Sequence, residues 1–306
     1  MKGFYSNGKL LITGEYVVLD GALSLAVPSV FGQSLDIEKG DKNLLTWTSF
    51  DEQDTVWFEA KFKLENNQIL DLINTNDKTV AKRLLQILRT AQQLNPEFLN
   101  DAPGYTISTE LGFPKNWGLG TSSTLINNIA NWAHIDPYQL LETTFGGSGY
   151  DIACASANQS LTYQLLQNGQ RNIHTVDFDP PFKTHLYFVH LNQKQNSREG
   201  IAQYKTNTSD TSLAISRINT ITQEMINCET LNEFQNLINE HELLISEIIK
   251  QTPVKQHLFK DFNGSIKSLG AWGGDFILVA SEANPTSYFK SKGFHTILPY
   301  SEMVRN

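Results

Sequence analysis

The sequence has few cysteines, no cluster of basic residues and no long apolar run. Its 306 residues include two cysteines, Cys154 and Cys228, which excludes a disulfide scaffold and a cysteine-rich zinc site. Both lie in helix-like stretches, so we predict buried free thiols and a reducing, cytoplasmic compartment. The longest apolar runs, such as Phe276 to Ala280, are too short to span a bilayer, and the N-terminal segment lacks the apolar core of a secretory signal. We therefore expect a globular protein without a membrane partner.

Charged residues are also sparse, at 18%, and the net charge is -8. An acidic chain without a Lys/Arg cluster binds nucleic acid poorly, so we expect no nucleic-acid partner. A phosphate-rich ligand would have to be held locally, by backbone N–H groups, one or two lysines and a metal ion. Apolar residues make up 40% of the chain, which is enough for a large core and excludes intrinsic disorder.

Periodicity predicts strands and helices without regular βα alternation, which favours an α+β fold over a doubly wound sheet. Strands are predicted at 34–39, 43–48, 56–64, 105–109, 161–166, 172–178, 186–191, 276–280 and 295–298, and in two short runs joined at Gly14 within 9–19. Helices are predicted at 80–94, 122–134, 138–143, 213–227 and 231–250, from 151 onward and near 287.

Asp179-Pro180-Pro181 is the clearest boundary signal in the chain. Two prolines remove two backbone donors and force an extended path, so we predict two domains, 1–180 and 181–306. The order β-α-α-β-α-β after the prolines is typical of helices packed on an antiparallel sheet. Thr230 and Glu233 have the spacing of a capping box at the start of the second long helix.

A glycine-rich cluster, FPKNWGLGTSST at 113–124, precedes a predicted helix. Gly118 and Gly120 allow positive φ and a close approach of backbone. Helix-opening hydroxyl residues, free N–H groups and the helix dipole together favour an anion. An ordinary cap after a glycine turn explains the same residues, so both interpretations stand for this cluster alone. No Walker sequence and no GxGxxG after a strand occurs anywhere in the chain.

Two further glycine-rich clusters each hold an aspartate. In GGSGYD, ending at Asp151, the aspartate is either a helix N-cap or a general base for a substrate hydroxyl. LGAWGGD, ending at Asp275, is either a tight turn or a glycine-lined wall that a ligand approaches. Lys9 is either a surface lysine or a cation that faces phosphates.

The order of the clusters is more specific than any one of them. GK and GE near the N-terminus, Pro-x-x-x-Gly-Leu-Gly-x-Ser-Ser before a helix, GSGxD and GAxGGD resemble the GHMP kinase family, from about Lys9 to Ala280. That family includes galactokinase, homoserine kinase, mevalonate kinase and phosphomevalonate kinase. The resemblance implies an ATP- and Mg²⁺-dependent small-molecule kinase, with a ribosomal protein S5 domain 2-like N-terminal domain and a ferredoxin-like C-terminal domain.

The resemblance also implies which residues hold ATP and metal. Those for ATP are Pro114, Asn116, Gly118, Leu119, Gly120, Thr121, Ser122, Ser123, Thr124, Gly273 and Gly274. Ser122 corresponds to the serine whose hydroxyl reaches Mg²⁺. Glu142 is the nearest match to the family's acidic metal ligand, although its spacing fits only with a small gap.

The remaining implied roles concern phosphoryl transfer and the acceptor. Asp151 corresponds to the catalytic base of mevalonate-kinase-like members, and Lys9 to the lysine that contacts that aspartate and the transferred phosphate. Glu15, Tyr16 and Ser148 correspond to residues beside the acceptor. The acceptor implied is mevalonate or a closely related compound of the mevalonate pathway, whose products lead to isoprenoids.

Two residues depart from the family pattern. Asn116 stands where the phosphate loop usually has glycine, and Trp272 replaces a glycine of the third cluster. KSLGAWGGD and GSGYD are closer to phosphomevalonate kinases than to mevalonate kinases. Three alternatives therefore stand beside mevalonate kinase: phosphomevalonate kinase, diphosphomevalonate decarboxylase and a non-catalytic nucleotide-binding member. The oligomeric state is open, with a homodimer as one option.

Overall fold

The computed structural model describes residues 2–66, 68–193, 197–206, 210–272 and 274–305. The chain forms two compact units. Unit 1 comprises Met1–Gly8, Phe31–Lys115 and Leu119–Ser156, and unit 2 comprises Lys9–Val30, Asn116–Gly118 and Ala157–Asn306. The domain boundary that the prolines predict falls inside unit 2, and the division at residue 180 stays a prediction.

Unit 1 is built on a twisted sheet in the order β5-β4-β3-β6-β2. Its strands are β3 (Leu44–Phe50), β4 (Val56–Glu65), β5 (Gln68–Thr75), β6 (Tyr105–Leu111) and the C-terminal part of β2 (Ser24–Lys39), with which β1 (Lys2–Leu11) also pairs. β3 runs parallel to β6, and the other pairs along this order are antiparallel. In β4, alternate residues are buried, as the period-two pattern predicts.

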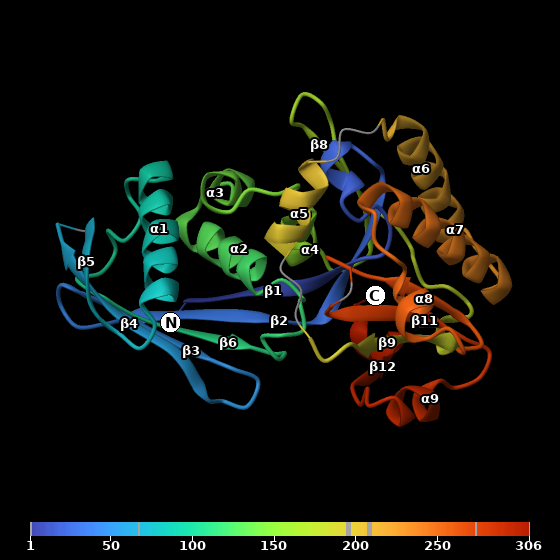
Figure 1. The fold of residues 1–306 in the computed structure, drawn as a ribbon. Helices are drawn as coiled ribbons and strands as arrows, with labels where there is room; N and C mark the ends of the chain where they lie inside the picture. The colour runs from blue at the N-terminus through green and yellow to red at the C-terminus, as the bar shows by residue number, and fades with distance from the viewer. Residues whose placement is uncertain (1, 67, 194–196, 207–209, 273, 306) are drawn as a thin grey trace. The chain divides into compact units, whose positions relative to one another are not determined.

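Among the described residues of unit 1, the helices are α1 (Lys78–Leu94), α2 (Thr121–Ala133), α3 (Pro137–Thr144) and α4 (Tyr150–Ser156). Helices α1, α2 and α3 cover one face of the sheet (Figure 1). Trp47 and Phe62 from the strands pack with Leu84 of α1 and Ile126 of α2 in the core of this unit. The start of α2, which follows the glycine-rich cluster, is thereby fixed to a rigid layer.

The second sheet, in unit 2, is antiparallel throughout, in the order β10-β11-β9-β12. Its strands are β9 (Leu186–His190), β10 (Ser265–Ser268), β11 (Phe276–Ala280) and β12 (Ile297–Pro299). The N-terminal part of β2 pairs in the same unit with β7 (Leu161–Leu165), and β7 pairs with β8 (Arg171–Thr175).

The helices of unit 2 are α5 (Ser197–Lys205), α6 (Ser212–Ile226), α7 (Leu231–Ile249), α8 (Val254–Leu258), α9 (Thr286–Ser291) and α10 (Tyr300–Met303), with short 3₁₀ helices η1 (Val17–Asp20) and η2 (Lys183–His185). Helices α6 and α7 pack along each other, and α7 packs on β10 (Figure 1). Thr230 caps α7 by accepting a hydrogen bond from the Glu233 amide at 3.3 Å, as predicted, but the Glu233 carboxylate accepts from the Thr230 hydroxyl at 2.9 Å and not from its amide, so the box is not complete.

The α+β class predicted from the sequence is confirmed, and some local predictions are corrected. The apolar run after Gly14 forms η1 and not a strand, because Gly14 and Tyr16 both have positive φ, 85° and 65°, and reverse the chain. Both cysteines are free, but only Cys154 is buried in a helix; Cys228 lies in the link between α6 and α7. Within the described residues, every helix is too short or too polar to cross a bilayer.

Candidate active site

The glycine-rich loop has the backbone conformation that its glycines suggest. Gly118 has φ 68°, and Gly120, the residue that precedes α2, has φ 97°. A Cβ atom on Gly118 would lie 2.3 Å from the Asp275 Cγ, so both the conformation and the close approach require glycine there. Backbone at this loop can therefore approach a neighbour more closely than any side chain would permit.

The N-terminus of α2 is arranged as an anion site. No side chain of the described residues caps this helix end. The Ser123 hydroxyl donates to the Gly120 carbonyl at 2.9 Å, and the buried Thr124 hydroxyl donates to Gln33 Oε1 at 2.7 Å. Ser122, in contrast, is exposed. The helix thus begins with amide donors, its positive dipole end and one solvent-facing hydroxyl, which suits a phosphate group.

Lys9 is tied to this loop within unit 2. Its Nζ donates to the Gly118 carbonyl at 2.9 Å. A small cavity beside this contact, about 10 Å³ in volume, is lined by residues that include Lys9, Gly118 and Asp275. The His190 Nε2 donates to the Asn116 carbonyl at 3.1 Å and so anchors the preceding part of the loop. Lys9 is half-buried beside the loop backbone, which disfavours the interpretation as an ordinary surface lysine.

Asp151 lies in unit 1, in the first turn of α4. Its Oδ1 accepts a hydrogen bond from the Ile152 amide at 3.1 Å, so it supports the helix start from inside the first turn and not from the N-cap position. The preceding loop has a conformation that favours glycine: Gly146, Gly147 and Gly149 have φ of 68°, 110° and 91°. Ser148 in the same loop is buried, and Asp151 is half-buried. The base role of Asp151 stays a prediction.

The predicted metal ligands do not form a cluster of acidic ligands. Glu142 lies exposed on α3 and Ser122 lies exposed at the start of α2. In the described part of the chain, no three or more His, Cys, Asp or Glu side chains are grouped so that they could hold a metal. Mg²⁺ commonly takes only one or two protein oxygens and completes its shell with phosphate oxygens and water. The residues present therefore fit Mg²⁺ only together with a phosphate ligand.

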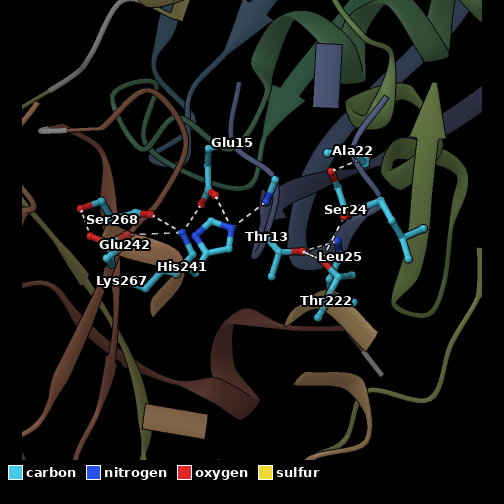
Figure 2. A network of polar contacts seen from close by, with 12 residues as sticks. Thr13, Glu15, Ala22, Ser24, Leu25, Thr222, His241, Glu242, Lys267 and Ser268 are labelled. Carbon is cyan, nitrogen blue, oxygen red and sulfur yellow. Dashed lines mark hydrogen bonds and ion pairs between the residues drawn. The ribbon is translucent and has the colours of Figure 1, made fainter. Parts of the chain in front are cut away.

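Glu15 belongs to a buried charged cluster that the sequence did not predict (Figure 2). Its Oε1 lies 2.5 Å from the Lys267 Nζ on β10, and both side chains are 0% exposed. Glu242 on α7 lies 3.5 Å from the same Nζ and accepts a hydrogen bond from the Ser268 hydroxyl at 2.7 Å. The neighbouring His241 Nε2 accepts a hydrogen bond from the Gly14 amide at 3.0 Å. We call these residues (Glu15, His241, Glu242, Lys267 and Ser268) the Lys267 cluster.

Burial sets the charges of the Lys267 cluster. It raises the pKa of Glu15, against the attraction of Lys267, and raises the pKa of Glu242 to about 7. Burial, aided by the Lys267 charge, also lowers the pKa of His241 well below its usual value. Because His241 Nε2 accepts a hydrogen bond, the imidazole is neutral with its proton on Nδ1. Burial and then Glu15 raise the pKa of Tyr16 to about 12, so Tyr16 stays protonated.

One signal in the sequence could have revealed the Lys267 cluster. The buried positions of α7 include Phe234, Ile238 and Ile245, and helical spacing places His241 and Glu242 on the same buried stripe. Polar residues on such a stripe need buried partners. The identity of the partner, Lys267, was not available from spacing because it lies on a distant strand.

Trp272 packs in an apolar cluster of unit 2. It is 1% exposed and shares this cluster with Tyr16 and Tyr204, whose rings lie 5.6 Å apart. Gly274 is buried nearby in sequence, and Gly273 lies outside the described residues. The indole therefore fills the core of this unit.

Comparison with solved structures gives clear matches over almost the whole chain. Mevalonate kinase of Methanococcus jannaschii aligns with 97% of this chain and 96% of its own, at a TM-score of 0.69 and 14% identity. Phosphomevalonate kinase of Streptococcus pneumoniae, solved with phosphomevalonate and AMPPNP, aligns with 95% of each chain at 0.66 and 15% identity. Galactokinase of Lactococcus lactis, solved with galactose, aligns with 100% and 95%, at 0.66 and 13% identity.

The chain has the GHMP kinase fold. This result agrees with the family that the order of the glycine-rich clusters suggested. No protein-family model matches the sequence, and the curated proteins gave no match. At 13 to 15% identity the GHMP kinase fold identifies neither the substrate nor the role of any single residue.

Proposed function

We propose that this chain is an ATP- and Mg²⁺-dependent kinase that phosphorylates mevalonate or a closely related acceptor of the mevalonate pathway. One observation carries the proposal: Lys9 Nζ binds the Gly118 carbonyl, at 2.9 Å, in the loop that opens α2. A cation, backbone amides and a helix N-terminus are then associated with one loop. Phosphoryl transfer depends chiefly on such positioning and charge neutralisation. The GHMP kinase fold supports the same assignment.

The phosphate loop would hold ATP mainly through its backbone. Gly118 and Gly120 give the curvature, and the amides that open α2 would donate to phosphate oxygens. The Ser123 and Thr124 hydroxyls are engaged within unit 1 and would act by keeping the loop in shape. The residues proposed for ATP are Pro114, Asn116, Gly118, Leu119, Gly120, Thr121, Ser122, Ser123, Thr124, Gly273 and Gly274.

Ser122 and Glu142 are proposed to hold Mg²⁺ together with the phosphates. Both side chains carry oxygen, the donor that Mg²⁺ prefers, and both are exposed. Bound Mg²⁺ neutralises phosphate charge. With ATP held in this way, an acidic protein needs no broad basic surface to bind a nucleotide.

Asp151 would accept the proton of the acceptor hydroxyl, and Lys9 would neutralise the transferred phosphate. For an acceptor that is already a phosphate no base is needed, and Asp151 would then serve to orient Lys9. Glu15, Tyr16 and Ser148 are proposed at the acceptor. In support, Glu15 Oε2 and the Tyr16 hydroxyl are buried without a hydrogen-bond partner among the described residues, so both are available to polar groups of a bound acceptor.

The finer assignments belong to the same proposal. The N-terminal domain, 1–180, would be the ribosomal protein S5 domain 2-like, ATP-binding part, and 181–306 the ferredoxin-like part. The cytoplasm is the proposed location, because both cysteines are free. Phosphomevalonate kinase is the second candidate, favoured by the glycine-rich sequences around Asp151 and Asp275.

An acceptor panel with ATP and Mg²⁺ tests this proposal. Acceptor-dependent ADP formation with mevalonate, and a product heavier by one phosphoryl group, would support it. Turnover only with phosphomevalonate would replace it by the second candidate, and release of carbon dioxide from a diphosphorylated acid would identify a decarboxylase. Tight ATP binding without turnover on any acceptor would identify a non-catalytic nucleotide-binding protein.

A further inference from the structure

We propose that Lys267 is a positioning residue, which holds the Glu15 carboxylate and thereby fixes the turn at Gly14, Glu15 and Tyr16. The proposed function assigns this turn to the acceptor, so the consequence for the acceptor rests on that function. The positioning itself does not, and it can be measured in the absence of any reaction.

Each of the three N–H groups of the Lys267 ammonium has an acceptor nearby. Nζ lies 2.5 Å from Glu15 Oε1 and 3.5 Å from Glu242 Oε1, and it donates to the Ser268 carbonyl at 2.9 Å. The side chain is 0% exposed. A lysine with three acceptors and no exposure has one orientation. Its shortest contact is the one to Glu15, and Figure 2 shows the two residues in the network.

The turn that carries Glu15 is anchored on both sides. The Thr13 hydroxyl lies 2.7 Å from the Thr222 hydroxyl of α6, and the Gly14 amide donates to His241 of α7. Gly14 has φ 85°, and a Cβ there would lie 2.1 Å from the Ser24 Oγ. The contact with Lys267 therefore makes β10 the third element, after α6 and α7, that holds this short segment.

Tyr16 gives the physical reason why the turn needs such anchoring. It is not a glycine, yet its φ is 65°. Backbone in this region persists only where the surroundings hold it, because an L-residue gives up free energy there. The residue directly before it is Glu15, whose carboxylate is fixed by Lys267. Loss of that contact would allow Tyr16 to relax.

Because of its charge, Lys267 is the member of the cluster that matters most for the position of Glu15. The titratable groups that face Glu15 are Lys267 from β10 and His241 and Glu242 from α7, with Tyr16 beside it in the chain. His241 is neutral, so Lys267 supplies the positive charge beside the two buried acidic side chains, Glu15 and Glu242. Without it, a carboxylate must take up a proton or leave its position, since an unpaired buried charge is unfavourable.

Hydrogen–deuterium exchange of the 12–18 segment, compared between wild type, Lys267→Met and Glu242→Gln, tests the positioning. The amides of Gly14 and Val18 report on the turn, because they bind His241 and the Gly14 carbonyl. We expect Lys267→Met to speed this exchange at least ~10-fold at constant pH. Glu242→Gln, whose amide oxygen can still accept from the Ser268 hydroxyl and whose NH2 group replaces the acceptor at 3.5 Å from Lys267, should leave the exchange within ~2-fold of wild type. If Lys267→Met does not fold, Glu15→Gln tests the same contact with little change in volume.

Acceptor kinetics of the same variants test the consequence for the acceptor. We expect Lys267→Met to raise KM for the acceptor at least ~10-fold and KM for ATP less than ~3-fold, with Glu242→Gln close to wild type. Unchanged exchange in 12–18 would overturn the positioning role, whatever the kinetics. Faster exchange with an unchanged acceptor KM would overturn the link to the acceptor. Wild-type protein without any turnover would overturn the proposed function, while the exchange data would still decide the role of Lys267.

Discussion

The glycine-rich loop before α2 and the turn at Glu15 both contain backbone with positive φ, but different forces hold them. The loop depends on residues without side chains, Gly118 and Gly120, and its shape follows from local backbone freedom. The turn contains a tyrosine at φ 65° and depends on charges brought from α7 and β10. The first kind of site is visible in a sequence because its residues are consecutive. The second appears only when distant segments are folded together.

Of the changes that distinguish the loop from the turn, substitution of Lys267 is expected to have the largest effect. Lys267→Met leaves two buried carboxylates without a cation, so the free energy of unfolding should fall by about 3–5 kcal/mol. Lys183→Met is the matched control, since Lys183 pairs with Asp179 at 2.6 Å while 40% exposed. It should cost less than ~1 kcal/mol. Urea unfolding measures both, and equal losses would contradict a special role for the buried cation.

Asp151→Asn should lower kcat at least ~10²-fold, with KM for ATP changed less than ~3-fold. An Asn can still accept the Ile152 amide, so the fold should survive. Asp136→Asn is the control: Asp136 caps α3 by accepting from the Tyr138 amide at 2.8 Å and belongs to no proposed site. Steady-state rates that are equal in the two variants would leave Asp151 with a helix-starting role alone.

A pair of glycines can separate backbone strain from close approach. Gly118 and Gly146 share φ 68°, but a Cβ on Gly118 would meet Asp275 at 2.3 Å, while Gly146 has nothing within 4 Å. Gly146→Ala should therefore cost about 1 kcal/mol of stability, from conformation alone. Gly118→Ala should cost about 1–3 kcal/mol and also raise KM for ATP. Equal stability losses, with KM for ATP unchanged in both, would show that close approach at Gly118 is unimportant.

The smallest expected effect is a pH dependence that belongs to Glu242. Its pKa is raised from 4.5 to about 7 by burial, so the folded state holds a proton that the unfolded chain releases. The free energy of unfolding therefore falls as the pH rises from 4.5 to about 7. Relative to Glu242→Gln, wild type should lose a few degrees of Tm between pH 5 and pH 8. The raised pKa of Glu15 acts in the same direction, and the lowered pKa of His241 acts in the opposite one. Wild type and Glu242→Gln both contain Glu15 and His241, so the difference in Tm between the two proteins reports on Glu242. A Tm difference that stays constant with pH would contradict a titrating Glu242.

The sequence predicted those features that depend on neighbours in the chain. The α1, α2 and α7 helices lie within about two residues of their predicted bounds, because apolar spacing and caps such as Thr230 are local signals. The N-terminal part of β2 was not predicted, since Pro28 and Gly32 interrupt its pattern. The run at Val17–Asp20 looked like a strand, and only the turn at Gly14 and Tyr16 makes it a 3₁₀ helix.

In the candidate site, too, the sequence predicted local backbone features but not the contacts between distant residues. The positive φ of Gly118 and Gly120 follows from residue type, and the structure has it. The contact of Lys9 with Gly118 joins residues 109 positions apart, and that of Lys267 with Glu15 joins residues 252 apart. Spacing rules do not reach such pairs. They depend on which faces of helices and strands meet, and hence on the packing of the whole unit.

Transfer of a phosphoryl group from ATP by this chain can be followed by ³¹P NMR of one reaction. The mixture contains the protein, ATP, Mg²⁺ and mevalonate, with Asp151→Asn as a parallel sample. We predict a new phosphomonoester signal that grows together with ADP in the wild-type sample and at least ~10² times more slowly in the variant. ADP formation at the same rate with and without any acceptor of the panel, and no phosphorylated product, would contradict it.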